Sequence, residues 1–406
     1  MWLYYPDGVY LSGSDGLFHY QRFVSVYNAV CEGRYPFFID LDCLNGYGYA
    51  TSLFYPDWLL LPFTLPIGWQ GFVTAFKAMI FCSFMSCGLV AYLTIRKISK
   101  NDACAALFAL LYTFSWYRLL DMSVRSAIGE LWSFTFIPLV VWGVYEIVRG
   151  DYTRKWYILV VGMAGLLYCH LLSALLTTVV LSVFLLLFFR PLASEPKRLR
   201  YLLTAGLVSL LLSAAFVFPL LEQLQSNTFY FETKPPMQIE AGLNPVGRFF
   251  DSLTRHGFIS DSTAHIGITL AFLFLFALIL LFIYRVLRKN GDKLVKLADG
   301  AMLSSLLLLL VISDIFPWTV FPFERLCRII QFPWRLLAFV SFFFSFAVSI
   351  YLYMGGMMIQ RSVGRKYGMI CRCFPVSGVA LTAVLSLLSL LIVLQMKSSA
   401  ASFQQG

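Results

Sequence analysis

A succession of long apolar segments, separated by mostly short loops, leaves few folds open to this chain. The composition is 59% hydrophobic and only 13% charged, which excludes a soluble protein built around one large core. A membrane-spanning helix takes roughly 20 apolar residues. The segments that meet or approach this length are Phe72–Ile95, Ala103–Arg118, Leu131–Val148, Trp156–Cys169, Leu172–Phe189, Tyr201–Leu221, His265–Tyr284, Ala301–Phe316, Leu336–Met354 and Val376–Gln395. We therefore expect an all-α polytopic membrane protein with about 10 transmembrane segments, of which Ala103–Arg118 and Trp156–Cys169 are short and tilted or partly buried.

The density of Lys and Arg alternates from loop to loop. One set of loops holds 19 of the 31 such residues: 96–102, 149–155, 190–200, 285–296 and 357–372. The alternate set holds 11: 1–71, 118–130, 222–264, 317–335 and 396–406. By the positive-inside rule the first set is cytoplasmic and the second, which carries most of the acidic residues, is outside. The net charge of +10 thus reflects topology, and no basic face with interleaved aromatics points to a nucleic-acid partner.

This topology divides the chain into three parts. Residues 1–71 form an extracytoplasmic loop with an amphipathic helix, residues 72–395 form the multi-span transmembrane domain with a second large outer loop at 222–264, and residues 396–406 form a short tail. No signal peptide opens the chain to carry 1–71 outside. We expect that a first helix precedes residue 1 in a longer natural chain; the alternative is that Phe72–Ile95 acts as a reverse anchor.

Two segments outside the membrane have the pattern of interfacial helices. Asp15–Gly33 has apolar residues at helical spacing, with Ser14 or Asp15 as N-cap and Gly33 as the terminating residue. Phe321–Arg335 opposes basic and apolar residues on two faces, and Pro333 is expected to end it. The loop 34–69, between the first of these helices and the predicted span Phe72–Ile95, is rich in Gly, Tyr and Pro and is expected to be irregular.

The outer helix carries the first group of residues that can do chemistry. Asp15, His19 and Arg22 follow one another at helical spacing, so they line one face. A carboxylate at a helix N-terminus is stabilised as an anion and can accept a proton, and a histidine one turn later can orient a hydroxyl or a phosphate. The alternative is structural: an N-cap aspartate beside an interfacial histidine.

Three further sites lie at the outer ends of spans. Glu130 begins a membrane helix, where a carboxylate needs a partner, and Arg125 is the nearest candidate; a purely structural pair is the alternative. His170 lies between two apolar segments and is either functional or a core histidine bonded to a neighbouring helix. Arg335 at headgroup level can hold a phosphate through paired hydrogen bonds, or simply snorkel to the interface.

The sequence gives little evidence for a metal site or for disulfides. The four His do not form a spaced ligand motif, so no metal site is predicted. The nine Cys are scattered and read as free thiols, with a Cys31–Cys43 disulfide in the outer loop left open.

Taken in order, these segments resemble one family. The motifs are Gly13-Ser14-Asp15 with His19 and Arg22, Gly46-Tyr47-Gly48-Tyr49 with Phe54-Tyr55-Pro56, the run from Val124 to Glu130, His170-Leu171-Leu172-Ser173, and Gln331-Phe332-Pro333-Trp334-Arg335. Over roughly residues 11–340 the chain resembles the bacterial "6-pyruvoyl-tetrahydropterin synthase-related" polytopic membrane proteins, which are similar to the GT-C superfamily of glycosyltransferases, including YfhO-like proteins.

The resemblance implies a GT-C-like helical bundle in the bacterial plasma membrane. It implies inverting transfer of a sugar from a polyprenyl-phosphate donor to a glycan, lipid or protein acceptor. Asp15 would be the general base, with His19 and Glu130 lining the same cleft, and Arg22, Arg125, His170 and Arg335 would bind substrate or lipid phosphate. No cofactor is implied with certainty, and a divalent cation is possible.

The chain departs from the family pattern at two points. The first transmembrane helix of the family is missing ahead of Asp15, and one acidic residue stands where metal-using members have a pair. Two other functions stay open: a flippase or transporter of lipid-linked glycan, and a non-catalytic scaffold. Transport favours charged or broken helices at mid-membrane, of which the sequence has few.

Overall fold

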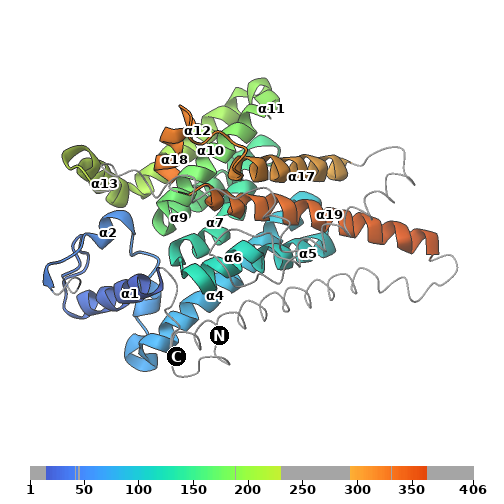
Figure 1. Cartoon of the computed structure of the whole chain (residues 1–406). Coiled ribbons are helices and arrows are strands. Elements are labelled where there is room, and N and C mark those ends of the chain that lie inside the picture. The colour runs from blue at the N-terminus through green and yellow to red at the C-terminus, as the bar shows by residue number, and fades with distance from the viewer. Residues whose placement is uncertain are drawn as a thin grey trace. The chain divides into compact units, whose positions relative to one another are not determined.

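The computed structural model describes residues 15–229, apart from 42, 44, 45 and 188, and residues 293–363, apart from 331. In these ranges the regular structure is helical (Figure 1), and strand pairing is limited to one isolated bridge between Asp40 and Tyr49. The prediction of an all-α protein is confirmed at this level. The chain divides into two compact units, one formed by Met1–Val90 with Val124–Lys234 and the other by Ala91–Ser123 with Pro235–Gly406.

The first unit begins with an outer helix and an irregular loop that carries two short helices. Its elements are α1 (Gly16–Cys31), α2 (Thr51–Phe54), α3 (Leu61–Thr64), most of α4 (Ile67–Ser99), α7 (Ile128–Val148), α8 (Tyr152–Lys155), α9 (Tyr157–Cys169), α10 (Leu171–Leu187), α11 (Phe189–Ser194), α12 (Pro196–Leu212) and α13 (Ala214–Ser226). The loop is held because Leu53 of α2 packs with Phe216 and Leu220 of α13 in a buried apolar cluster.

Glycines bring α7 and α9 into close packing. A Cβ on Gly143 would lie 2.4 Å from the backbone nitrogen of Leu159, and one on Gly162 would lie 2.8 Å from that of Val140. Small residues allow this approach, and in a membrane such packing replaces the hydrophobic effect as a source of helix association.

The second unit is built around a helix pair. Its elements are α5 (Asp102–Thr113), α6 (Trp116–Leu120), α17 (Lys293–Ile312), α18 (Phe323–Ile330), a 3-10 turn (Pro333–Leu336) and α19 (Leu337–Val363). The boundary with the first unit falls within a π-helical segment (Asp121–Arg125), between Ser123 and Val124. α17 and α19 lie side by side (Figure 1), joined by a 2.8 Å hydrogen bond from the Tyr351 hydroxyl to Asp299. Asn101, at the start of α5, donates to the Tyr353 hydroxyl of α19 at 2.8 Å.

Five stretches in the described residues are long and apolar enough to cross a membrane, and a sixth is added if one bent pair counts as a span. They are Ile67–Ser99, Asp102–Ser123, Ile128–Val148, Lys293–Ile312 and Pro333–Met354. In α4 the non-helical Gly71, with φ +75°, makes the continuous helix begin where the predicted span Phe72–Ile95 begins. These findings support a membrane-embedded protein.

Other predicted spans differ from the structure. Tyr201–Leu221 is broken, because Ser213 leaves the helical conformation and α12 and α13 meet at 77°. Trp156–Cys169 corresponds to the 13-residue α9, which is too short to span alone. His265–Tyr284 and Val376–Gln395 lie outside the described residues.

The two predicted interfacial helices are present with different lengths. Asp15–Gly33 matches α1, and Gly33 ends it with φ +70°, as expected for a glycine C-cap. Asp15 occupies the predicted N-cap position, but its side chain makes no capping hydrogen bond, and Ser14, the alternative cap, lies outside the described residues. Phe321–Arg335 contains the shorter α18, and Pro333 opens the 3-10 turn that leads into α19.

Candidate functional site

The N-terminus of α1 is fixed to the segment that precedes α7. The backbone N–H of Asp15 donates to the carbonyl of Arg125 at 3.0 Å, and the carbonyl of Asp15 accepts the first helical hydrogen bond from the His19 N–H. The half-buried Asp15 carboxylate does not cap the helix. It is therefore held by its backbone at the positive end of α1, where an anion is stabilised.

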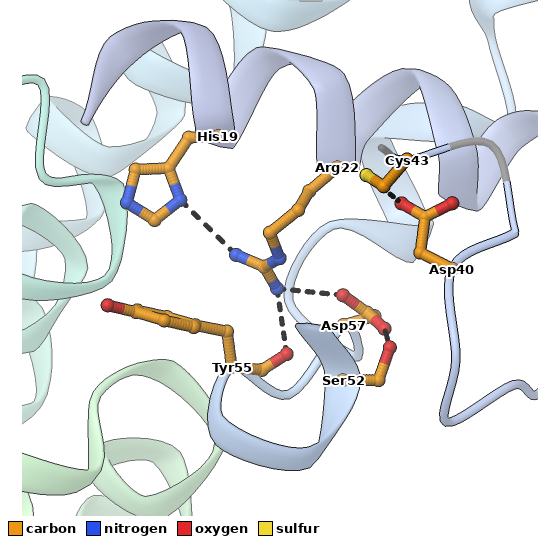
Figure 2. Close-up of polar contacts among 7 residues, drawn as sticks. All are labelled: His19, Arg22, Asp40, Cys43, Ser52, Tyr55 and Asp57. Atoms are coloured by element: carbon orange, nitrogen blue, oxygen red, sulfur yellow. Dashed lines mark hydrogen bonds and ion pairs between the residues drawn. The ribbon is translucent and has the colours of Figure 1, made fainter. Parts of the chain in front are cut away.

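A buried ion pair ties the middle of α1 to the loop. One terminal nitrogen of Arg22 donates to Asp57 at 2.7 Å and to the Tyr55 carbonyl at 2.8 Å, and Ser52 donates to the other oxygen of Asp57 (Figure 2). The side chains of Arg22 and Asp57 are only 6% and 4% exposed. The ion pair joins the irregular loop to α1, and the apolar contacts of Leu53 join the same loop to α13.

His19 lies next to this pair and is itself buried. Its Nδ1 lies 3.2 Å from the second terminal nitrogen of Arg22, and its ring meets the Tyr55 ring edge-on at 5.7 Å (Figure 2). Burial holds the pKa of His19 well below its usual value of 6.5, and the charges of Arg22, His170 and Arg125 lower the pKa further. His19 is therefore neutral at pH 7.

Arg125 and Glu130 form the second ion pair, as the sequence predicted. The guanidinium of Arg125 donates to Glu130 at 2.9 Å, with Glu130 1% exposed and Arg125 15% exposed. Between them Ser126 has φ +55°, an uncommon conformation for a residue with a side chain. The turn thus brings the guanidinium back onto the first turn of α7.

His170 caps the next helix in the same region. Its ring Nδ1 accepts from the Ser173 backbone N–H at 3.3 Å and lies 2.7 Å from the Ser173 hydroxyl, which is N-cap geometry at the start of α10. This junction lies against α7, because a Cβ on Gly129 would be 2.5 Å from the Cys169 carbonyl oxygen. His170 is therefore close to the Arg125–Glu130 turn.

The first unit brings together six of the seven residues singled out from the sequence. Backbone contact links Asp15 to Arg125, ion pairing links Arg125 to Glu130, and the charges of Arg125 and His170 act on His19, which contacts Arg22. Arg22, proposed for substrate binding, is engaged with Asp57 and Tyr55 instead of facing open solvent.

Arg335 belongs to the second unit. Its guanidinium donates to the Ile330 carbonyl at 2.8 Å and lies 5.5 Å from the centre of the Phe332 ring. It is buried at the start of α19 and not exposed as a snorkelling side chain. Phosphate binding by Arg335 stays a prediction.

Three members of the site were not anticipated from the sequence: Ser52, Tyr55 and Asp57. The Phe54-Tyr55-Pro56 motif was noted, yet nothing in its spacing tells which oxygen would meet Arg22. Cys43 lies beside this group and donates its thiol to Asp40 at 3.1 Å (Figure 2). Cys31 and Cys43 are both free thiols, so the disulfide left open above is not formed.

The donor set does not fit a metal ion. Over the residues that the structure describes, no group of three or more His, Cys, Asp or Glu side chains is arranged to hold one. The carboxylates of Asp57 and Glu130 are each neutralised by an arginine. What the arrangement offers is a carboxylate, a neutral imidazole and paired guanidinium groups.

No family model matches the chain, and no solved structure matches it. A curated protein of Lactococcus lactis subsp. cremoris (strain MG1363), described as an uncharacterized protein, is 24% identical over 234 residues. The match covers 55% of this chain and 38% of the relative, so the chain spans well under half of the relative's length. The site geometry thus carries the functional argument.

Proposed function

We propose that this chain is a membrane glycosyltransferase that moves a sugar from a polyprenyl-phosphate donor to an extracytoplasmic glycan, lipid or protein. One observation carries the proposal: the N-termini of α1 and α7 are brought together, with the Asp15 backbone bonded to Arg125, Arg125 paired with Glu130, and a neutral His19 within range of the Arg125 charge. The sequence resemblance to the GT-C superfamily supports the same reading.

In this proposal Asp15 is the general base. The acceptor hydroxyl loses its proton to the Asp15 carboxylate as its oxygen bonds to the anomeric carbon of the donor. The bond from that carbon to the phosphate oxygen breaks, and the phosphate leaves with the electron pair. A phosphate leaving group needs positive charge and hydrogen-bond donors more than it needs an acid. Arg125, whose guanidinium Glu130 holds at 2.9 Å, supplies hydrogen-bond donors for that group.

The side of the membrane follows from the distribution of charge. The loops that contain Asp15, Arg125 and Glu130 belong to the set with fewer Lys and Arg residues. The positive-inside rule assigns that set to the outside of a bacterial plasma membrane. A lipid-linked donor, with its phosphate at the outer headgroup level, fits a site on that side.

A flippase or transporter of lipid-linked glycan is the second candidate. The observations that favour it are the 77° break between α12 and α13, and the buried Lys77 inside the apolar helix α4. Broken helices and intramembrane charges often mark transport pathways. A non-catalytic scaffold is the third candidate.

The test uses the protein in proteoliposomes with radiolabelled polyprenyl-phosphate sugars and crude envelope acceptor. Asp15→Asn removes the base and should lower transfer by about 10²–10⁴-fold. Asp102→Asn is the matched control, because Asp102 is exposed and pairs with Arg96, and it should leave transfer unchanged. Equal transfer by wild type and Asp15→Asn would remove Asp15 from the chemistry. No transfer from any donor of the panel would favour transport or a scaffold.

A further inference from the structure

The hydrogen bond between Arg22 and His19 has a direction that the chemistry fixes. A guanidinium has five N–H donors and no acceptor, so a ring nitrogen facing it must be the acceptor. The nitrogen that faces Arg22 at 3.2 Å is Nδ1 of His19. In a neutral imidazole one nitrogen accepts and the other carries the proton, so the proton of His19 is on Nε2.

Arg22 is in turn held by a fixed set of acceptors. Asp57 and the Tyr55 carbonyl bind one terminal nitrogen at 2.7 and 2.8 Å, and Ser52 donates to Asp57, which orients the carboxylate. The guanidinium plane therefore has little freedom, and its other terminal nitrogen stays directed at Nδ1. Figure 2 shows Nε2 of His19 on the far side of the ring, turned away from Arg22.

We infer that His19 is a fixed Nε2–H hydrogen-bond donor for a phosphate oxygen, that Arg22 and Asp57 are its positioning residues, and that His19 is not the proton acceptor of the site. The assignment of a phosphate as the ligand rests on the proposed function, whereas the tautomer rests on geometry alone. It deepens that function by separating two roles: Asp15 takes the proton, and His19 donates to the leaving group.

The surroundings of His19 support a donor and oppose a base. The charged groups that act on His19 come from three places: Arg22 on α1 pairs with Asp57, Arg125 before α7 pairs with Glu130, and His170 at the start of α10 contacts Ser173. Burial first, and then the nearby positive groups, hold the pKa of His19 low and so disfavour the imidazolium that a base would have to become. Over the described residues Nε2 makes no hydrogen bond within the protein, although His19 is only 4% exposed, so a ligand is the partner that the proposal assigns to this N–H.

The first measurement determines the tautomer in the wild-type protein, and a substitution serves only to assign the signal. The protein with ¹⁵N-labelled histidine, in lipid nanodiscs, gives signals from only four His residues, and His19→Gln identifies that of His19. We expect the neutral Nε2–H tautomer at pH 7, with Nδ1 as an unprotonated acceptor. An imidazolium or an Nδ1–H tautomer would overturn the inference.

The second measurement compares two amides at position 19. The amide nitrogen of Gln reaches about as far as Nε2, whereas that of Asn reaches only as far as Nδ1. Farnesyl phosphate is the probe, with inorganic phosphate as the parallel arm. His19→Gln should keep most of the affinity for farnesyl phosphate, and His19→Asn should weaken it by about tenfold to a hundredfold, the loss of one hydrogen bond to a charged group.

The outcomes separate this inference from the proposed function. Equal affinity of wild type, His19→Gln and His19→Asn would overturn the donor role. Binding of inorganic phosphate without binding of farnesyl phosphate would overturn a lipid-linked ligand. The expected tautomer and affinities, together with no sugar transfer from any donor, would support the donor role and overturn the glycosyltransferase proposal.

Discussion

The buried pair between Arg22 and Asp57 gives the sharpest test of how the outer helix is held. Asp57→Asn keeps the shape of the side chain and removes its charge, which leaves the Arg22 guanidinium buried without its carboxylate. Removing one partner of a buried pair destabilises by about 3–5 kcal/mol. The Tyr55 carbonyl and the rings of Phe18 and Tyr55, at 5.8 and 5.2 Å from the guanidinium, remain as partners. We therefore expect a loss near the lower end, about 3 kcal/mol.

Hydrogen exchange of α1 is the suitable assay, because the pair joins α1 to the loop and contributes nothing directly to α7 or α9. A loss of about 3 kcal/mol corresponds to roughly a hundredfold faster exchange by local opening. Peptides from Tyr157–Cys169 provide the internal reference. Glu32→Gln is the matched variant: it makes the same carboxylate-to-amide change in an exposed pair with Arg34, next to the C-terminus of α1, and should leave exchange unchanged.

A double variant separates the cost of the unpaired guanidinium from the effect of altered packing. Arg22→Met with Asp57→Asn removes the stranded guanidinium and should restore much of the protection, since a buried pair replaced by uncharged side chains is often neutral in stability. Exchange of α1 within threefold of wild type in Asp57→Asn would refute the reasoning. So would a double variant no better protected than Asp57→Asn, because the penalty would then not arise from the unpaired charge.

The remaining predictions concern packing and protonation. Gly143→Ala should lower the unfolding temperature because its Cβ would lie 2.4 Å from a backbone nitrogen of α9, whereas Gly206→Ala meets nothing within 4 Å and should raise stability by up to about 1 kcal/mol; changes of the same sign would count against the packing. The pKa of His19 is lowered in the folded state, so below about pH 6.5 the unfolded chain binds the additional proton and the free energy of unfolding should fall as the pH falls. His19→Gln should remove that slope in pH-dependent thermal unfolding, and an unchanged slope would assign it elsewhere. Arg125→Gln should destabilise more than Glu130→Gln, because Glu130 is the more deeply buried partner; thermal unfolding that ranks them in the reverse order would contradict this.

The outer helix could be predicted from the sequence because its signals are local. Helical spacing of apolar residues and a glycine at the end require only neighbouring residues, and α1 begins and ends within two residues of the predicted Asp15–Gly33. The cap was the exception. Asp15 occupies the N-cap position without capping through its side chain, and the start of the helix is held instead by the Asp15 N–H donating to the Arg125 carbonyl, in a segment far along the chain. Tertiary contacts of this kind leave no periodicity in the sequence.

The same limit explains which parts of the site were missed. Arg125 and Glu130 are separated by one turn of chain, and their pairing was expected from sequence. Arg22 and Asp57 are 35 residues apart across a loop rich in Gly, Tyr and Pro, whose path depends on side-chain contacts that no repeat predicts. The predicted span Tyr201–Leu221 differs from the structure for a related reason: hydropathy gives the length of an apolar run, and it does not register that Ser213 leaves the helical conformation and divides the run into α12 and α13.

Stability alone gives a weak reason for a buried ion pair between an outer helix and an irregular loop, since two apolar side chains could hold them together equally well. Apolar side chains could not, however, orient a hydrogen-bond donor toward His19. A guanidinium fixed by Asp57 and the Tyr55 carbonyl presents an N–H to one nitrogen of His19 and so determines which nitrogen of that ring carries the proton. The double variant Arg22→Met with Asp57→Asn should therefore separate the two contributions, because α1 would stay folded while the histidine would lose the group that orients it.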